Sequence, residues 1–400
     1  MSISNISWEA QLDLTIVNSS VQEALKTKKL FRYQFKDSSS FVNILEKAIS
    51  EYVGSDFALG VSSATNAIFL ALKALGVDSN SKVLIPAFTF TAVPSAVIQC
   101  GAEPVLIDIT ESYVIDLEDL KRKILSSKAQ YLLLSHMRGH LCDMDEVVKI
   151  CEESSIVLIE DAAHALGVTW KGKQAGTFGI AGIYSLQSYK IINAGEGGVL
   201  VTNNPDVFWK SVFMSGSYEN NYKLHSSKSN DIAKRYKNHL PVFNVRMNNI
   251  TAALAIPQIK NIETTIDHIN KNYTKLSKHL LERKEIKFPK ENFSIRSVRD
   301  SAQMRIKLNQ NSLENLKSEL NDINIPISYF GGLNNSNARL YQNWSFLENR
   351  NHILPNTKKN LSEVFDLRLP IHFQSKDIDI IAKSFLQVFD KVKGQKNSFS

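Results

Sequence analysis

Short, continuous apolar segments alternate with segments of helical character in the first half of the chain. Between residues 63 and 75, apolar side chains recur every three or four positions and Gly76 follows, which predicts a helix with a left-handed end. Strands that are apolar on both faces and separated by helices are typical of a mostly parallel sheet flanked by helices. The pattern therefore predicts an α/β fold. The seven expected strands are residues 57–61, 82–85, 104–108, 131–135, 156–160, 182–185 and 198–201.

The pattern changes near residue 262. After this position, charged segments with helical spacing become frequent and strand-like apolar runs become fewer. Such a shift predicts two domains. We expect a large domain over residues 1–262, which includes the N-terminal segment, and a smaller α+β domain over residues 263–400.

Composition and charge exclude several classes of protein. The 47 basic residues are interspersed with 40 acidic ones and form no dense basic block, so the net charge of +7 does not favour nucleic-acid binding. No apolar run reaches the roughly 18 to 20 residues that cross a bilayer, and the polar start lacks an export signal. The three cysteines have no paired spacing and the histidines no metal-ligand spacing. We expect a cytoplasmic protein without a metal, nucleic-acid or membrane partner.

The candidate chemistry follows two of the apolar strands. Lys190 comes after the strand at 182–185 and before a glycine-rich turn, and Asp161 ends the strand at 156–160. Loops at the carboxyl ends of strands form the ligand-binding edge of an α/β sheet. A lysine amine there can bond to the aldehyde of pyridoxal phosphate, while an acid holds the pyridine nitrogen protonated. Taken singly, a solvated lysine and a helix-capping aspartate are the ordinary alternatives.

Six motifs in a fixed order strengthen this interpretation. Their order resembles that of the DegT/DnrJ/EryC1/StrS family of pyridoxal-phosphate-dependent sugar aminotransferases, from about residue 41 to about 258 and more faintly after Leu354. The resemblance implies a fold type I aminotransferase that uses pyridoxal 5′-phosphate and works as a homodimer with shared active sites. The motifs are Ser62-Ser63-Ala64-Thr65, Pro86-Ala87-Phe88-Thr89-Phe90, Glu160-Asp161-Ala162-Ala163-His164, Ser185 to Lys190, Gly195-Glu196-Gly197-Gly198 and Phe243-Asn244-Val245-Arg246-Met247.

The resemblance assigns roles around the cofactor ring. It implies that Lys190 is the catalytic lysine and that Asp161 holds the pyridine nitrogen. His164 would reach the phenolic oxygen, and Phe90 would stack on the ring. Without the resemblance, a histidine or an aromatic residue at these positions is more often a structural group.

The resemblance also implies the groups that hold the phosphate. Ala64 and Thr65 open a helix, where free N–H groups and the helix dipole favour an anion. Most family members have glycine where this chain has Ala64, and an ordinary Ser/Thr cap is the alternative for this segment. Ser185 matches a second phosphate-binding hydroxyl. Asn244 matches an asparagine that reaches the phosphate from the partner subunit.

The substrate class rests on the resemblance as well. It implies that a keto group on a sugar is converted to an amine, with an amino acid, expected to be glutamate, as donor, for surface polysaccharide synthesis such as that of lipopolysaccharide. Arg138 can bind a carboxylate bidentately, which raises an acidic keto-octulosonate beside a nucleotide-linked keto sugar. A surface arginine is the ordinary alternative. Residues 327–334 depart from the His-Tyr and Pro-Leu signature of many nucleotide-sugar members.

Two further functions stay open. One is a sugar dehydratase on the same scaffold, but relatives of that type often carry histidine in place of the lysine, so Lys190 argues against it. The other is a regulatory or binding protein without catalysis. An intact set of cofactor residues makes catalysis the simpler account.

Overall fold

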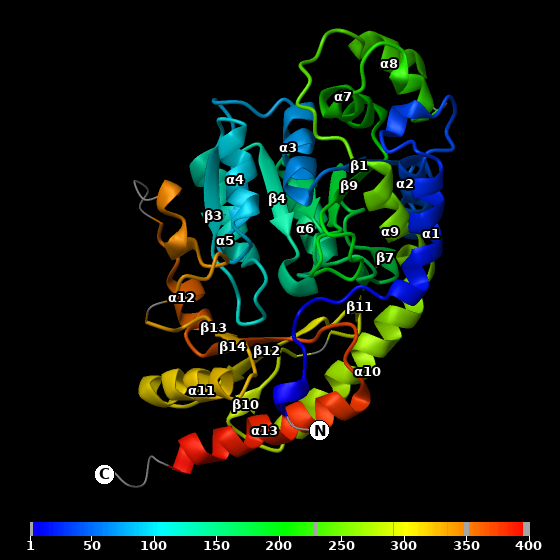
Figure 1. The fold of residues 1–400 in the computed structure, drawn as a ribbon. Helices are drawn as coiled ribbons and strands as arrows, with labels where there is room; N and C mark the ends of the chain where they lie inside the picture. The colour runs from blue at the N-terminus through cyan, green and yellow to red at the C-terminus, as the bar shows by residue number, and fades with distance from the viewer. Residues whose placement is uncertain (1–2, 227–229, 291, 334, 348–351, 395–400) are drawn as a thin grey trace.

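The computed structural model describes residues 3–226, 230–290, 292–333, 335–347 and 352–394 (Figure 1). Its main unit is a seven-stranded sheet with the order β1-β9-β8-β5-β4-β2-β3. Each strand lies within one residue of a predicted strand at both ends. The strands are β1 (Phe57–Val61), β2 (Lys82–Pro86), β3 (Glu103–Ile107), β4 (Tyr131–Ser135), β5 (Val157–Asp161), β8 (Ala181–Ser185) and β9 (Gly198–Thr202).

The sheet is mostly parallel, as predicted. Only β9 runs against its neighbours β1 and β8, and the other pairs are parallel. All residues of β1, β8 and β9 are buried, which explains why these strands are apolar without alternation. This burial follows from the helices that cover both faces of the sheet.

Alternate side chains of the strands enter two separate cores. Within β2, for example, Leu84 belongs to one core while Val83 and Ile85 belong to the other. The helices on the first face are α1 (Leu14–Lys26), α2 (Phe41–Val53), α5 (Leu117–Ser127), α6 (Met144–Glu153) and α9 (Asn249–Lys260). Those on the second are α3 (Ala64–Ala74), α4 (Ala92–Gln99), α7 (Pro205–Ser215) and α8 (Asn230–Tyr236).

The C-terminal part has its own antiparallel sheet of four strands in the order β10-β12-β14-β13. A third core joins this sheet to its helices and also includes Ile6 of the N-terminal segment. Conversely, Trp344 and Leu347 pack into a core of the large sheet. The strands are β10 (Ile286–Lys287), β12 (Ser301–Ile306), β13 (Ile327–Tyr329) and β14 (Val364–Arg368), and the helices are α10 (Ile262–Leu280), α11 (Gln310–Asp322), α12 (Pro355–Leu361) and α13 (Ser375–Gly394).

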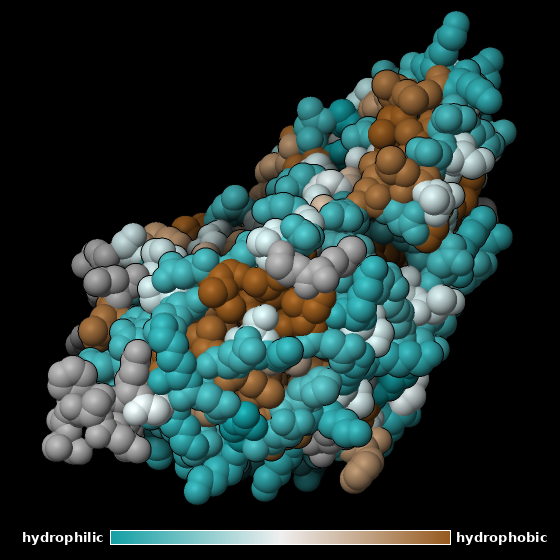
Figure 2. All heavy atoms as spheres, turned by 60° about the horizontal axis from the view of Figure 1, so that its bottom comes forward, coloured by the Kyte–Doolittle hydropathy of each residue, from teal (hydrophilic) through white to brown (hydrophobic). Residues whose placement is uncertain are grey.

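A shared helix and a small sheet connect the large-sheet unit with the C-terminal part. Helix α10 contributes Ile266 to the first core and Leu276 to the third, so it spans both units (Figure 1). A small sheet of β6 (Thr169–Trp170), β7 (Lys173–Gln174) and β11 (Ile295–Arg296) also connects them. Viewed from the end that lies at the bottom of Figure 1, the surface is largely hydrophilic with separate apolar patches (Figure 2).

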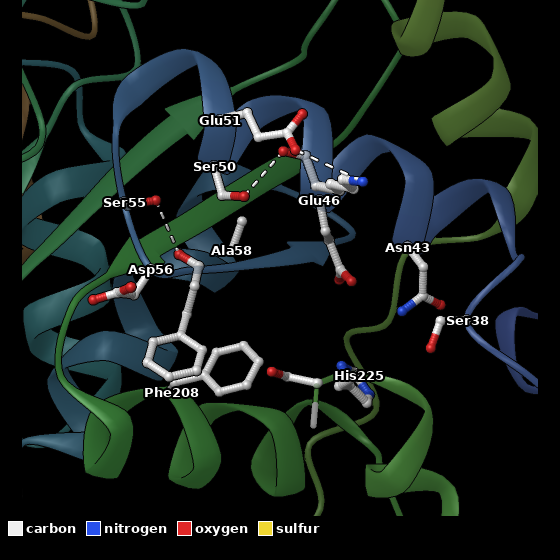
Figure 3. A pocket seen from close by; sticks show the side chains of 13 residues that line it. Ser38, Asn43, Glu46, Ser50, Glu51, Ser55, Asp56, Ala58, Phe208 and His225 are labelled. Carbon is white, nitrogen blue, oxygen red and sulfur yellow. Dashed lines mark hydrogen bonds and ion pairs between the residues drawn. The ribbon is translucent and has the colours of Figure 1, made fainter. Parts of the chain in front are cut away.

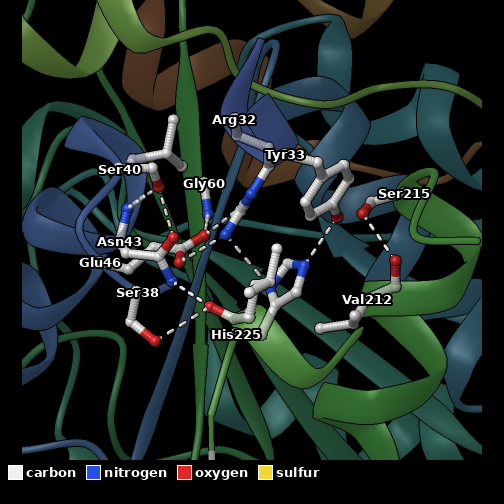
Figure 4. Close-up of polar contacts among 12 residues, drawn as sticks. Arg32, Tyr33, Ser38, Ser40, Asn43, Glu46, Gly60, Val212, Ser215 and His225 are labelled. Atoms are coloured by element: carbon white, nitrogen blue, oxygen red, sulfur yellow. Dashed lines mark hydrogen bonds and ion pairs between the residues drawn. The ribbon is translucent and has the colours of Figure 1, made fainter. Parts of the chain in front are cut away.

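A buried polar cluster ties the N-terminal segment to the large sheet (Figure 4). The Arg32 guanidinium, 2% exposed, donates two hydrogen bonds to the Glu46 carboxylate at 2.8 and 3.0 Å. Glu46 also accepts the backbone N–H of Gly60 in β1 at 2.8 Å. His225 accepts a hydrogen bond from Arg32 at 3.2 Å, and burial lowers the pKa of this histidine well below its usual range, which keeps it neutral.

Beside this cluster, a surface cavity of about 540 Å³ opens between α2 and α7 (Figure 3). Its lining includes Glu51, Asp56 and Phe208. It shares no lining residue with the cavity around Lys190. In the described part of the chain, no group of His, Cys, Asp or Glu side chains is arranged to hold a metal, and no helix is long and apolar enough to cross a membrane.

Candidate active site

A cavity of about 410 Å³ lies where β5 and β8 end. Seven of the nine residues that sequence analysis singled out line it: Ala64, Thr65, Phe90, Asp161, His164, Ser185 and Lys190. Arg138 and Asn244 do not. The motifs are far apart in the sequence and meet here because parallel strands end at one edge of the sheet.

Lys190 lies on the loop between β8 and β9. Its Nζ is 2.7 Å from Nε2 of His164. Burial lowers the pKa of Lys190 from the ordinary 10.5 to about 7, although the Asp300 carboxylate acts in the opposite direction. Burial also lowers the pKa of His164 well below its usual range, and the neighbouring lysine charge adds to this effect. Near neutral pH the amine is therefore partly uncharged and can attack a carbonyl carbon.

Asp161 is the last residue of β5 and is 6% exposed. The Ser135 hydroxyl donates to its Oδ2 at 2.7 Å, and the Ala163 N–H donates to its Oδ1 at 3.2 Å. These two hydrogen bonds fix the orientation of the carboxylate at the cavity wall. A buried carboxylate needs an opposite charge, which a protonated pyridine nitrogen provides.

The N-terminus of α3 forms another wall of the cavity. Ser63 caps this helix by accepting the N–H of Asn66 at 3.2 Å, while the N–H groups of Ala64 and Thr65 have no acceptor within the described residues. Gly198 packs directly against this turn, because a Cβ at position 198 would lie 2.4 Å from the Ala64 nitrogen. Free N–H groups at a helix start suit a phosphate, and the Ser185 hydroxyl lines the same cavity.

The remaining candidates have different surroundings. Phe90 lines the cavity and is 44% exposed, so one side of its ring is available to a ligand. Asn244 is exposed, has a φ of 58° and lies outside this cavity. Its assignment to a partner's site stays a prediction.

Arg138 is buried, which differs from the surface arginine that was its ordinary alternative. Its side chain is 5% exposed, and its Nε and one terminal nitrogen donate to Oδ2 of Asp366 at 3.1 and 2.6 Å. The guanidinium is therefore paired within the protein through two of its nitrogens, and its binding of a substrate carboxylate stays a prediction.

Sequence reasoning missed Arg339 and Arg368, both of which line the cavity. Arg368 ends β14, in the stretch where the family resemblance returned faintly, and this was the one signal that could have indicated it. Arg339 lies in an irregular segment that no pattern distinguished.

The DegT/DnrJ/EryC1/StrS aminotransferase family model matches residues 18–386 of the chain. The chain belongs to this family. A GDP-perosamine synthase of Vibrio cholerae is 33% identical over 227 residues, which is 56% of this chain and 59% of the relative. A 3-amino-5-hydroxybenzoate synthase of Amycolatopsis mediterranei is 30% identical over 240 residues, 60% of each protein. The chain thus matches less than two thirds of the length of these relatives.

Solved structures are similar in fold to this family member over nearly its whole length. Helicobacter pylori PseC, an aminotransferase involved in the biosynthesis of pseudoaminic acid, has a TM-score of 0.82 at 20% identity and covers 96% of this chain and 98% of its own. A 3-amino-5-hydroxybenzoic acid synthase has a TM-score of 0.81 at 22% identity and covers 97% and 99%. These likenesses confirm the predicted fold type I architecture.

Pyridoxal 5′-phosphate is the cofactor of this family, as predicted, and the cavity fits it. An amine, a buried carboxylate and a helix start with free N–H groups face one space, at Lys190, Asp161 and Ala64. A structurally similar Streptococcus pneumoniae protein has been solved in a form that contains this cofactor.

Proposed function

We propose that this protein is a pyridoxal-phosphate-dependent aminotransferase that converts a keto group of a sugar to an amine, with glutamate as the expected donor. The observation that carries the proposal is the shared cavity of Lys190, Asp161 and the start of α3. The substrate class is supported by relatives whose names refer to amino sugars, the GDP-perosamine synthases and PseC. Surface polysaccharide synthesis, including that of lipopolysaccharide, is the process we infer.

The side chains can perform the proton movements that this reaction needs. When bound, pyridoxal phosphate supplies an aldehyde and a ring that withdraws electrons from the substrate carbon. The Lys190 amine can attack the aldehyde, accept a proton from one carbon and return it to another. His164 stays neutral at 2.7 Å from this amine and so adds no competing positive charge. Asp161, held by two hydrogen bonds, keeps the ring nitrogen protonated.

A homodimer with shared active sites is part of the proposal. Asn244 is exposed and lies outside the cavity of its own chain, as expected of a residue that serves a second subunit. Asn244→Ala should weaken cofactor binding, and mixing it with Lys190→Ala subunits should restore some activity. The three cysteines are free and buried, which suits the cytoplasmic location that we infer.

Labelling of the cofactor lysine tests the activity. Borohydride reduction of the loaded protein followed by peptide mass spectrometry should place the label on Lys190. Lys190→Ala should abolish the label, whereas Lys171→Ala should keep it, since that side chain is 61% exposed and pairs with Asp145. Asp161→Asn should load cofactor but lose turnover. A label on another lysine would contradict the proposed role of Lys190.

Amine transfer tests the substrate class. The wild-type protein loaded with pyridoxal phosphate should transfer nitrogen from ¹⁵N-glutamate to a keto sugar, detected as a labelled amino sugar by mass spectrometry. A nucleotide-linked 4-keto-6-deoxy sugar and a keto-octulosonate should be compared as acceptors. If glutamate fails to convert the bound cofactor, glutamate is not the donor, and failure of every amino acid offered would contradict the aminotransferase proposal. Loss of water from the sugar without nitrogen transfer would instead support a dehydratase.

A further inference from the structure

Two arginines from the C-terminal part face the same cavity as Lys190. Arg368 is the last residue of β14. Arg339 precedes Leu340, which is anchored to the large domain by a backbone bridge to Phe88 and by the small core around it. Two separate segments therefore bring guanidinium groups to one space.

Arg368 is held against the loop that carries the lysine. Its guanidinium carbon is 4.5 Å from the centroid of the Tyr189 ring, and its Nη2 donates to the Tyr189 backbone carbonyl. Stacking on an aromatic ring fixes the plane of a guanidinium while leaving other N–H groups free to donate. Arg368 is thus oriented next to Lys190 without a carboxylate partner.

Arg339 has unused hydrogen-bonding capacity. Its backbone N–H and its Nη1 donate to Oδ1 of Asn337 at 3.0 and 3.4 Å. Its Nε is buried, and nothing in the described part of the chain accepts a hydrogen bond from it. Burial lowers the pKa of Arg339 to about 10, so the side chain still carries its charge at neutral pH. A buried charged donor without an acceptor is costly unless a ligand supplies one.

Arg339 and Arg368 differ from Arg138 in their relation to the carboxylates nearby. Arg138, Arg339 and Arg368 all interact electrostatically with the carboxylates of Asp300 and Asp366, and the carboxylates of Asp161 and Glu196 line the cavity as well. Asp366 is bonded to Arg138 at 2.6 Å. Across the described residues, neither Arg339 nor Arg368 forms an ion pair with a carboxylate within 4.0 Å. The two arginines are therefore available to an anion from outside.

The cofactor phosphate has another place in the same cavity. The start of α3 and the Ser185 hydroxyl belong to the large domain, on elements different from those of the two arginines. A substrate is the remaining source of negative charge. Paired guanidinium groups match the planar, two-oxygen geometry of a carboxylate.

We propose that Arg339 and Arg368 form a carboxylate-binding subsite for the acceptor, so that the preferred acceptor is an acidic keto sugar. This inference rests on the proposed function, because it assumes that a sugar enters the cavity. The carboxylates of the amino-acid donor have the same chemistry, and the experiment must separate the two sources.

Binding of matched sugars to the cofactor-loaded protein tests the subsite by calorimetry, without turnover. The probes are glucuronate against glucose and UDP-glucuronate against UDP-glucose, which differ only in a carboxylate at the sixth carbon. Wild type should bind the acid of at least one pair about tenfold tighter or more, the effect of a charge-assisted hydrogen bond. The pair that shows the preference tells whether the acid is free or nucleotide-linked.

Arg339→Gln and Arg368→Gln should each remove the preference for the acid while leaving affinity for the neutral sugar unchanged. Arg368→Lys keeps the positive charge but not the planar guanidinium group, so this variant should retain part of the preference for the acid. Arg235→Gln is the matched control, because this exposed arginine pairs with Asp206 away from the cavity. Circular dichroism and melting temperature should show that each variant is folded.

Three results would overturn the inference. If the wild-type protein binds the acid and the neutral sugar equally well in both pairs, the inference is wrong, and no variant is needed to show it. If the variants lose the same affinity for the acid and for the neutral sugar of a pair, the arginines only shape the cavity. If the variants lose only the conversion of bound cofactor by glutamate, and keep the preference for acidic sugars, the arginines serve the donor. Failure of the proposed function would give a different result, because glutamate would then not convert the cofactor bound to the wild-type protein.

Discussion

The lowered pKa of Lys190 makes cofactor loading sensitive to pH in an unusual range. The perturbation is a pH series on the cofactor-free protein, in which the rate of attack on an aldehyde follows the fraction of neutral amine. Burial lowers the pKa of this lysine to about 7. Since a lysine is a base, lowering its pKa makes the neutral form dominant above pH 7 instead of above pH 10.5.

The expected size of the effect follows from that value. With a pKa of about 7, the neutral fraction rises from about 9% at pH 6 to about 91% at pH 8, roughly tenfold, and then levels off. A lysine with an ordinary pKa would show a rise of about a hundredfold over the same interval and would keep rising tenfold per pH unit to about pH 10. The two cases differ in both slope and plateau.

Stopped-flow absorbance during mixing with excess aldehyde measures this rate. Pyridoxal should be used beside pyridoxal phosphate, because the second ionisation of a phosphate lies near pH 6 and would distort the profile. Asp300→Asn should move the midpoint to lower pH, since this carboxylate favours the charged amine, and Arg339→Gln should move it to higher pH. A rate that keeps rising above pH 9 would refute the assignment of a buried, partly neutral lysine.

Two structural predictions concern stability and the phosphate site. Gly198→Ala should weaken cofactor binding at least tenfold and lower the melting temperature, because its Cβ would lie 2.4 Å from a backbone atom of α3, whereas Gly394→Ala, with nothing within 4 Å, should change neither. Arg32→Ala should lower the free energy of unfolding in urea by about 3 to 5 kcal/mol because it leaves the buried Glu46 carboxylate unpaired. Arg235→Ala, at a pair that is 61% and 42% exposed, should change it by less than about 1 kcal/mol, and equal effects at the two sites would contradict the reasoning.

The large sheet was predictable because its strands carry their own signal. Strands buried on both faces read as continuous apolar runs, and helix α3 shows its period and its terminal Gly76. Pattern alone did not reveal that β9 runs antiparallel, because a buried strand has the same composition in either direction. It also did not reveal that Ile6 packs with the C-terminal core, since a single apolar residue has no period.

The site was predictable to the extent that its residues lie on motifs next to strands. Lys190 and Asp161 lie there, and the structure brings them to one cavity. The pairing of Arg138 was not predictable for a physical reason: a lone arginine in a loop gives no sign of the acid that will pair with it, and Asp366 is 228 residues away. Arg339 and Arg368 were missed for the same reason, because only tertiary structure shows that they face the cavity without an acid.

The cofactor-binding groups and the two arginines of the cavity come from different parts of the fold. The seven-stranded sheet, with the loops and the helix that follow its strands, supplies the amine, the carboxylate and the helix start, which suit the cofactor. The C-terminal part supplies Arg339 and Arg368, which line the same cavity. Residues 327–334, where the sequence departs from many nucleotide-sugar members, lie shortly before Arg339 in the chain. If Arg339 and Arg368 bind the acceptor as proposed, changes in these segments would alter acceptor choice without disturbing the chemistry at Lys190.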